Sequence, residues 1–316
     1  MEVVAPGELP APDQGAAVTI GAYDGVHIGH RRIIRLVLER AAERGLRSAV
    51  VTFDRHPATV VRPESAPLLL TGTEHKLELL ESCGVDLTVV VPFDEHRANE
   101  TAEDFVGEVL VGALGARAVV VGEDFHFGHG RKGNVGLLRE LGAVHGFSVE
   151  GVPLTVVTTP SAPEEVVSST RIRALVAAGD VAQAAALLAR PHEVRGTVVA
   201  GDRRGGALGF PTANLAVPPG MAVPATGIYA GWFRRAGAPL QLAAISVGRR
   251  PTFYADGHGA PLVEAFVLDF DGDLYGERAG VAFAERLRDE QRFDRVEDLV
   301  AQMSDDVERT RELLGR

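Results

Sequence analysis

The chain has 316 residues, of which 46% are hydrophobic and 24% are charged, which is the balance of a soluble globular protein with an ample core. This composition excludes a disordered chain, a fibre and a coiled coil, and the length favours two domains of roughly 100 to 200 residues each. The 32 basic and 43 acidic residues give a formal net charge of -11, which would repel a phosphate backbone, so nucleic acid is not expected as a partner.

The cysteine content and the N-terminal sequence bear on the compartment. Cys83 is the only cysteine, so the chain holds no internal disulfide and no cysteine-based zinc cluster, and packing is its expected role. The N-terminal residues include acids and prolines where a secretory signal has a basic start and an apolar run, and no apolar stretch is long enough to span a bilayer. We expect a cytoplasmic protein without a membrane partner, as a monomer or a weak homo-oligomer.

From Ala16 to about Arg190, short β-rich runs alternate with longer amphipathic stretches. This alternation indicates βαβ units and a parallel sheet. Gly45 is predicted to end the first helix of this region. Gly179 is predicted to end the helix in RIRALVAAG, and Asp180 to cap the next helix, VAQAAALLAR. The runs on which this α/β prediction depends are AAVTI, RRIIRLVLERAAERG, SAVVTF, LTVVV, AEDFVGEVLVGAL and AVVVG.

The first chemical motif, GAYDGVHIGH, connects a predicted strand to a predicted helix. Backbone N–H groups and the helix dipole favour an anion at such a turn, so we predict a phosphate site. Gly29 would let a triphosphate approach the backbone, and His27 and His30 could donate hydrogen bonds to the charge that builds on an α-phosphate during nucleotidyl transfer. Capping or packing by two histidines is the weaker interpretation, because of their H-x-G-H spacing. Three further residues of the motif are assigned to nucleotide binding: Gly21, Tyr23 and Asp24.

A second motif, VVSSTRIRALVAAG, places hydroxyl and guanidinium groups at a helix start. These groups suit the β- and γ-phosphates of a nucleotide, although ordinary N-capping is the better explanation of the hydroxyl groups when the motif is taken alone. The residues assigned to the nucleotide here are Ser168, Ser169, Thr170 and Arg171.

Two loops between these motifs, TFDRHP and VGEDFHFGHGRKGN, each follow an apolar strand-like run. Ligands of open α/β sheets gather at the carboxyl ends of the strands, so Asp124, Phe125 and Phe127 are candidates for contacting a planar ring. Equally, the two phenylalanines could belong to the core and Asp124 to a turn.

After Pro191 the sequence changes to short strand-like runs separated by glycine-rich turns, with almost no helical periodicity until Val296. This pattern predicts an antiparallel β-barrel or sandwich with a C-terminal surface helix. We therefore place the seam at 189 to 191, which gives an α/β domain over 1–190 and a β domain over 191–316.

The β domain begins with a glycine-rich turn that contains two arginines, followed by Pro-Thr-Ala-Asn. This segment offers a nucleotide loop without a Walker lysine, and Pro211 fixes the start of the extended segment that follows. Thr212 and Asn214 alternate along that segment, so they point to the same side and could present a hydroxyl and an amide oxygen to Mg²⁺ and phosphate. A β-turn with polar tips is the alternative. The glycines assigned to this loop are Gly201, Gly205 and Gly209.

Glu264 lies within a strand-like run, where a carboxylate has little structural reason to be unless it is exposed or functional. We interpret it as a general base that accepts the proton of an alcohol attacking a γ-phosphate, while Mg²⁺ and positioning do most of the catalysis. A charge on an edge strand is the alternative.

Taken together and in order, these motifs resemble the bifunctional bacterial riboflavin kinase/FMN adenylyltransferases, also called FAD synthetases, from about Val18 to the C-terminus. The motifs that carry the resemblance are GAYDGVHIGH, VTFDRHP, VGEDFHFGHGRKGN, VSSTRIR, LGFPTANL, GIYAGW, VGRRPTF, VEAFVLDFDGDLYG and LRDEQRF.

The resemblance implies a Rossmann-like nucleotidyltransferase domain followed by a barrel kinase. The kinase would phosphorylate riboflavin to FMN and the first domain would adenylylate FMN to FAD, with ATP as co-substrate and Mg²⁺ in both steps. The planar ring that Asp124, Phe125 and Phe127 are candidates to contact would then be the flavin. By position, His27 and His30 would stabilise the adenylyl transition state, Ser168, Thr170 and Arg171 would hold the triphosphate, and the kinase would use residues already named: Thr212 and Asn214 for Mg-nucleotide and Glu264 as base.

The chain departs from the family pattern at two places. Family members often have asparagine where this chain has Ala22, and G-T-N-P-T-F where it has Gly248 to Phe253, so that Arg249 and Arg250 add charge near a ligand loop. Two alternatives stay open: a paralogue that acts on a flavin analogue, uses another nucleotide or keeps one activity, and a non-catalytic flavin-binding regulator.

Overall fold

The computed structural model describes residues 1–8, 14–159, 162–201, 209–249 and 261–315. The chain divides into two compact units, Met1–Ser169 and Thr170–Arg316. This division lies upstream of the predicted seam at 189 to 191, because the helix over 181–188 packs with the strands that follow it.

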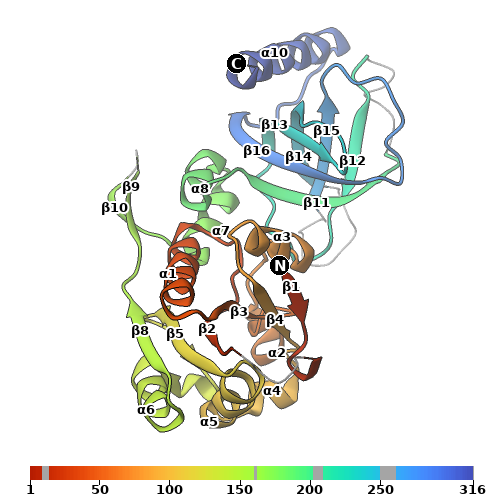
Figure 1. Cartoon of the computed structure of the whole chain (residues 1–316). Helices are drawn as coiled ribbons and strands as arrows, with labels where there is room; N and C mark the ends of the chain where they lie inside the picture. Colours follow the sequence, from red (N-terminus) through yellow and green to blue (C-terminus); the bar gives the residue numbers. More distant parts are fainter. Residues whose placement is uncertain (9–13, 160–161, 202–208, 250–260, 316) are drawn as a thin grey trace. The chain divides into compact units, whose positions relative to one another are not determined.

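The first unit is built on a six-stranded sheet with the strand order β1-β4-β3-β2-β5-β8 (Figure 1). All neighbouring strands are parallel, which confirms the α/β fold class predicted for this part. Because both faces are covered, the central strands are continuous apolar runs. The strands are β1 (Glu2–Val4), β2 (Ala16–Ile20), β3 (Arg47–Phe53), β4 (Leu87–Val91), β5 (Ala116–Gly122) and β8 (Ser148–Val152).

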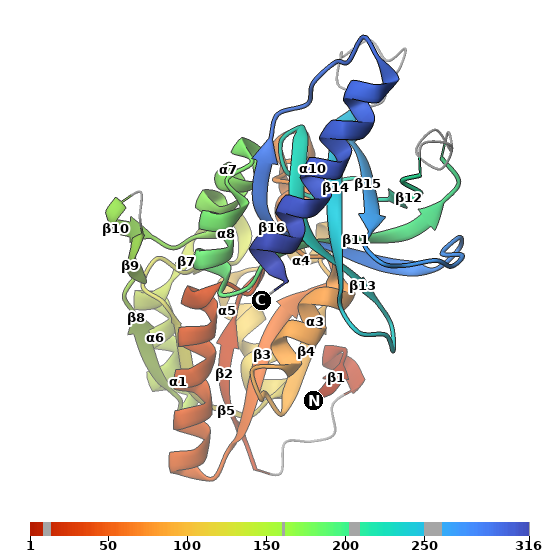
Figure 2. The same ribbon diagram turned by 90° about the horizontal axis from the view of Figure 1, so that it is seen from above.

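Helices cover the two faces of this sheet (Figure 2). Ala17 of β2 packs in one cluster with Val37 of α1, whereas its neighbour Val18 packs in another with Phe105 and Leu138, so α1 lies on one face and α5 and α6 on the other. The helices of the unit are α1 (Ile28–Arg44), α2 (Ala58–Val61), α3 (Thr73–Glu81), α4 (Glu95–Asn99), α5 (Ala102–Phe105), the π-helix η3 (Val106–Ala113), α6 (Val135–His145) and the 3-10 turns η1 (Pro6–Glu8), η2 (Pro63–Ser65) and η4 (His129–Arg131). Two short hairpins complete it, β6 (His126–Phe127) with β7 (Gly133–Asn134) and β9 (Val156–Thr159) with β10 (Ala162–Val166).

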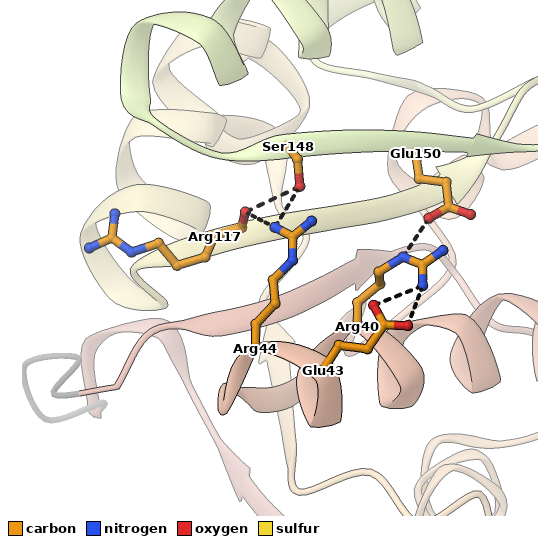
Figure 3. Close-up of polar contacts among 6 residues, drawn as sticks. All are labelled: Arg40, Glu43, Arg44, Arg117, Ser148 and Glu150. Carbon is orange, nitrogen blue, oxygen red and sulfur yellow. Dashed lines mark hydrogen bonds and ion pairs between the residues drawn. The ribbon is translucent and has the colours of Figure 1, made fainter.

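Helix α1 is fixed at its C-terminal end by polar contacts with the edge of the sheet (Figure 3). Arg40 donates to Glu150 of β8 at 2.9 Å, and Arg44 donates to the Ser148 hydroxyl at 2.9 Å and to the Arg117 carbonyl at 3.3 Å. Gly45 ends the helix in the left-handed conformation, with φ 63°, as predicted. These contacts hold the C-terminal end of α1 against β5 and β8, while its N-terminal end follows the loop after the central strand β2.

The second unit contains a closed six-stranded barrel with the order β11-β12-β15-β14-β13-β16, in which each strand is antiparallel to its neighbours. The barrel and its C-terminal helix confirm the second part of the predicted fold. Its core is made by alternate residues of the strands, with Tyr229, Phe233 and Phe283 fully buried. The strands are β11 (His192–Val199), β12 (Thr212–Ala216), β13 (Gly227–Arg235), β14 (Gln241–Arg249), β15 (Pro261–Val267) and β16 (Arg278–Arg288).

Three helices belong to the region after the first unit's strands: α7 (Ser169–Ala178), α8 (Val181–Leu188) and α10 (Val296–Leu314). Helix α10 packs on β13 and β14, and α8 packs on β11 and β16. Gly179 takes φ 80° after α7, and the Asp180 carboxylate accepts the Gln183 N–H at 3.2 Å, so both predicted helix signals are confirmed.

Two smaller predictions concern Cys83 and the membrane. Cys83 is partly buried against a core cluster and its thiol donates to the Leu79 carbonyl, which agrees with a packing role. Among the described residues, none of the helices has both the length and the apolar character needed to cross a membrane.

Candidate functional site

The parallel sheet has a switch point between β2 and β5, because the chain runs from β2 through β3 to β4 on one side and from β5 to β8 on the other. Ligands of such sheets bind outside the carboxyl ends of the strands at this point. The GAYDGVHIGH motif follows the last residue of β2, TFDRHP includes the end of β3, and GEDF begins at the last residue of β5. The structure therefore brings the three predicted loops to one edge of the sheet.

The loop after β2 is strained. Tyr23 has φ 50° and Val26 has φ 39°, although neither is glycine and Val26 is β-branched. Such angles cost free energy and persist where the surroundings determine the conformation, which happens most often at ligand-binding and catalytic loops. The strain therefore supports a functional role for this loop independently of its histidines.

A buried carboxylate holds one side of the loop. Asp24 is 4% exposed, and its carboxylate accepts hydrogen bonds from the N–H groups of Leu70 and Thr71, both at 3.0 Å. The Thr71 hydroxyl in turn accepts the Gly25 N–H at 3.0 Å. The structure thus places Asp24, which we predicted to bind nucleotide, among backbone groups that fix the loop.

Side chains from distant segments bind the carbonyl groups of the same loop. The Ala22 carbonyl accepts from Thr52 at 3.3 Å and from Lys76 at 3.4 Å. The Asp24 carbonyl accepts from the Ser169 hydroxyl at 2.8 Å. These contacts explain how the strained conformation is held, and they involve Thr52, Thr71 and Lys76, to which the sequence analysis assigned no site role.

His27 and His30 lie together at the start of α1. Their rings stack with centroids 3.6 Å apart and an angle of 17° between the planes. His27 is the N-cap residue, and its Nδ1 accepts the His30 N–H at 3.3 Å. Because Nδ1 is an acceptor, a neutral His27 has its proton on Nε2, which is the nitrogen that can donate to a ligand.

Close contacts explain two glycines of the motif. A Cβ on Gly29 would lie 3.2 Å from the His27 ring, and one on Gly21 would lie 3.1 Å from the Tyr23 ring. The Tyr23 hydroxyl is 2.6 Å from the Thr19 hydroxyl, and burial raises the pKa of Tyr23. A Cβ at either position would need the neighbouring ring to shift by a few tenths of an ångström, so the close packing of the loop on itself favours glycine, in addition to the approach of a phosphate that we predicted at Gly29.

The SSTR motif begins helix α7, as predicted, and Ser169 is its first residue. Ser168 and Ser169 are half-buried, Thr170 is exposed and Arg171 is half-buried. The Ser169 hydroxyl donates to the Asp24 carbonyl in the loop over 21–27, which we call the histidine loop, so the two predicted phosphate motifs meet at this residue. Thr170 and Arg171 follow it in the chain as the first residues of the second unit.

The three flavin candidates after β5 differ in burial. Asp124 is exposed, and a Cβ on Gly122 would lie 2.8 Å from its carboxylate. Phe125 is half-buried and stacks on Phe127 at 5.3 Å between centroids. Phe127 is 9% exposed and belongs to the core, so the ring available at this edge of the sheet is that of Phe125.

In the second unit, three polar residues form a row across adjacent strands. Asn214 of β12 pairs with Glu264 of β15, and Glu264 pairs with Ser246 of β14. Directly opposed residues have Cβ atoms about 4.5 to 5.5 Å apart. Their neighbours Leu215, Val263 and Ile245 fill the barrel core, so the row lies on the outer side of the barrel wall.

The nucleotide loop predicted before β12 is described in part. Gly201 lies against the side chain of Asn214, so closely that a Cβ there would overlap the amide, and Asn214 is 5% exposed. Gly209 has φ 87°, which favours glycine, and Pro211 is exposed. Thr212 is half-buried at the first position of β12. Gly205 lies outside the described residues.

The second ligand loop, at the end of β14, is also described only at its start. Arg249 is exposed at the last position of the strand, and the Gly248 position is close to Glu290, whose carboxylate would lie 3.1 Å from a Cβ there. Arg250 and the following Pro-Thr-Phe lie outside the described residues. The effect of the two arginines on a ligand therefore stays a prediction.

Comparisons with known proteins agree on the family of both units. The FAD synthetase family model matches residues 9–171 and the riboflavin kinase family model matches residues 188–314. The bifunctional riboflavin kinase/FMN adenylyltransferase of Escherichia coli (strain K12) is 35% identical over 305 residues, covering 96% of this chain and 95% of that protein. The protein of the same name from Bacillus subtilis (strain 168) is 31% identical over 309 residues, covering 97% and 95%.

A solved structure from Streptococcus pneumoniae is similar over nearly the whole chain. It is a crystal structure named for a macrolide-efflux protein from Streptococcus pneumoniae. The match covers 98% of this chain and 99% of that one, with a TM-score of 0.85 and 30% sequence identity.

Proposed function

This chain belongs to the family of bifunctional riboflavin kinases/FMN adenylyltransferases, and from that premise we propose which of its residues carry each of the two reactions. It is an enzyme that phosphorylates riboflavin to FMN and adenylylates FMN to FAD. We assign adenylyl transfer to the switch-point loops of the parallel sheet and phosphorylation to the polar row of the barrel.

In adenylyl transfer, a phosphate oxygen of FMN attacks the α-phosphorus of ATP and pyrophosphate leaves. Negative charge grows on the α-phosphate oxygens in the transition state, and His27 and His30 at the start of α1 are placed to donate hydrogen bonds to it. The helix N-terminus adds favourable electrostatic potential. Ser168, Thr170 and Arg171 would bind the departing pyrophosphate, and Phe125 offers a ring for the isoalloxazine.

In phosphorylation, the terminal hydroxyl of riboflavin attacks the γ-phosphorus of ATP and ADP leaves. Glu264 would accept the hydroxyl proton, which a carboxylate does as the oxygen begins to bond to phosphorus. Its place beside Asn214 in the row across the barrel supports this role, because the base and the nucleotide site then share one face. Neither reaction needs a covalent enzyme intermediate.

The donor set near Glu264 fits Mg²⁺ carried in by ATP. The Thr212 hydroxyl and the Asn214 amide oxygen are hard oxygen donors on one side of β12, and Mg²⁺ prefers such oxygens together with substrate phosphates and water. No cluster of three or more histidine, cysteine, aspartate or glutamate side chains suited to a metal occurs among the described residues. When bound, Mg²⁺ would neutralise charge on the transferring phosphate.

Several further assignments complete the proposal. ATP is the nucleotide for both steps, and the enzyme works in the cytoplasm as a monomer or a weak homo-oligomer without nucleic acid or membrane partners. We propose that the boundary between the two catalytic modules lies at 189 to 191, so that a fragment over 191–316 folds alone and retains riboflavin kinase activity.

The observation that carries the proposal is the presence, in one chain, of consecutive matches to both family models, over residues 9–171 and 188–314. The test is a time course with purified protein, riboflavin, ATP and Mg²⁺, followed by chromatography of FMN and FAD. We expect FMN first and FAD later. Parallel incubations with other nucleotides, with supplied FMN and with a chelator identify a change of nucleotide, loss of one step and the metal requirement.

Two results would contradict this assignment. Flavin binding without any turnover would indicate a regulator, and turnover only with another nucleotide or a flavin analogue would indicate a paralogue.

A further inference from the structure

Lys76 is a buried cation beneath the histidine loop. It is 7% exposed on α3, whose other buried residues are His75, Leu79 and Leu80, and it is one of two lysines in the chain. Its Nζ donates to the Phe53 carbonyl at 2.7 Å and to the Ala22 carbonyl at 3.4 Å. The ammonium therefore bridges the carboxyl end of β3 and the loop that follows β2.

This bridge acts on the part of the loop that is strained. Ala22 directly precedes Tyr23, the first of the two non-glycine residues with positive φ in this loop, and the loop leads from there to His27. The Thr52 hydroxyl binds the same carbonyl from β3 as a neutral donor, whereas Lys76 brings a charge to it. A charged donor forms a stronger hydrogen bond than a neutral one.

We propose that Lys76 is a positioning residue for adenylyl transfer, whose ammonium holds the loop after β2 in the conformation that sets His27 and His30 against the α-phosphate. The inference rests on the proposed function of this loop. Lys76 itself contacts carbonyl groups, so it acts through the loop and not on the reacting atoms.

Two carboxylates attract the buried charge. Asp24 faces it from the loop after β2 and Asp54 from the end of β3. Burial nevertheless lowers the pKa of Lys76 to about 8, against the attraction of these two groups. The ammonium is thus present below about pH 8 and is lost as the pH rises through that value, so the hydrogen bonds to the loop weaken on the alkaline side.

The central variant is Lys76→Met, which keeps a long unbranched side chain and removes the charge and the donors. The matched control is Arg35→Met, which removes one positive charge from an exposed side chain on α1 of the same unit. The rate of FAD formation from supplied FMN, ATP and Mg²⁺ is measured for both, and circular dichroism confirms that each variant is folded.

We expect kcat of adenylylation to fall about 10- to 100-fold in Lys76→Met, because a small misplacement of catalytic groups has that effect. The KM values should change less, since the loop conformation matters most in the transition state. Arg35→Met should match the wild type. Riboflavin kinase activity, measured in the same samples, should be unchanged in both.

The pH dependence of adenylylation shows whether Lys76 acts through its charge or only through the packing of its side chain. In the wild type, kcat/KM for adenylylation should fall through a single ionisation near pH 8 towards the level of Lys76→Met. That fall should be absent in Lys76→Met. In Lys76→Arg, whose guanidinium stays charged, activity should persist to about pH 10.

The inference is overturned if folded Lys76→Met adenylylates FMN at the wild-type rate, or if its activity falls near pH 8 as the wild-type activity does. If Lys76→Met does not fold, a wild-type profile that is flat between about pH 7 and about pH 9 overturns it, and a fall that Lys76→Arg abolishes supports it. Absence of FAD formation by the wild-type protein at neutral pH would instead contradict the proposed function of the unit.

Discussion

The two units present their candidate catalytic residues in different ways. In the first unit, His27 caps helix α1 and His30 lies in its first turn, directly after a strained loop. In the second, Asn214 and Glu264 are paired residues of adjacent strands in a closed barrel. The histidine loop lies beyond the end of its strand, whereas the strand residues are placed by the register of the barrel itself.

This difference determines which substitutions are expected to disturb each site. The shape of the loop depends on side chains from segments far apart in the sequence, such as Thr71, Lys76 and Ser169. The polar row depends on backbone pairing, which most side-chain substitutions leave intact. Substitutions at remote positions are therefore expected to impair adenylylation more often than phosphorylation.

The strongest test of the comparison is to separate the units. A fragment over 191–316 should form FMN and no FAD, because the complete barrel and the residues assigned to phosphorylation lie within it. A fragment over 170–316 should do the same and be more stable, since it keeps Val181, which is 1% exposed and packs in the barrel core. Burial of a valine contributes about 1.5 to 3 kcal/mol, and denaturant titration measures the difference. A soluble, cooperatively folded fragment that forms no FMN at high riboflavin would show that the kinase site borrows residues from the first unit.

The next largest effect is expected in the barrel. Glu264→Gln should lower riboflavin phosphorylation about 10²- to 10⁴-fold, because the amide keeps the shape of the side chain but does not accept a proton. Adenylylation of supplied FMN should be unaffected. Initial rates of FMN and FAD formation measure both effects. Unchanged phosphorylation would show that Glu264 is only a charge on the barrel surface. If both activities are lost, circular dichroism shows whether the variant is misfolded.

A somewhat smaller effect is expected at the histidine loop. His30→Ala should lower FAD formation about 10²- to 10³-fold, since it removes one donor aimed at the transition state, while FMN continues to accumulate. The stacked His27 ring loses its partner at 3.6 Å, so the melting temperature of the variant should be recorded beside its rates. If His30→Ala lowers both activities equally, the assignment of His30 to adenylylation is wrong.

The sequence predicted the features that depend on local pattern. The parallel sheet, the barrel, the helix ends at Gly45 and Gly179 and the position of GAYDGVHIGH at a strand end all follow from periodicity, turn residues and capping residues. The residues that hold the histidine loop in place could not be predicted from the sequence pattern. Lys76 lies in an amphipathic helix like many surface lysines, and only the tertiary structure shows that it is buried under Ala22.

In the barrel, too, the sequence pattern predicted local features but not which strands are neighbours. Thr212 and Asn214 were predicted to share one side of a strand from their spacing alone. The pairing of Asn214 with Glu264, from a strand much further along the sequence, depends on the strand order of the closed barrel, which alternation along each strand does not determine.

The smallest effect tests whether the units are independent in stability. Gly45 after α1 and Gly237 in the turn between β13 and β14 have φ values of 63° and 69°, and within the described part of the chain neither has a neighbouring atom within 4 Å of an added Cβ. Alanine at either position therefore meets only the backbone cost of the left-handed conformation, about 1 to 2 kcal/mol. Gly45→Ala should lower the temperature at which adenylylation is lost on heating by a few degrees and leave the kinase unchanged, and Gly237→Ala should do the reverse. Residual activities after brief heating, assayed separately for the two reactions, measure both shifts. If either variant lowers both temperatures equally, the units unfold together, and the difference in sensitivity between loop and barrel then belongs to catalysis and not to stability.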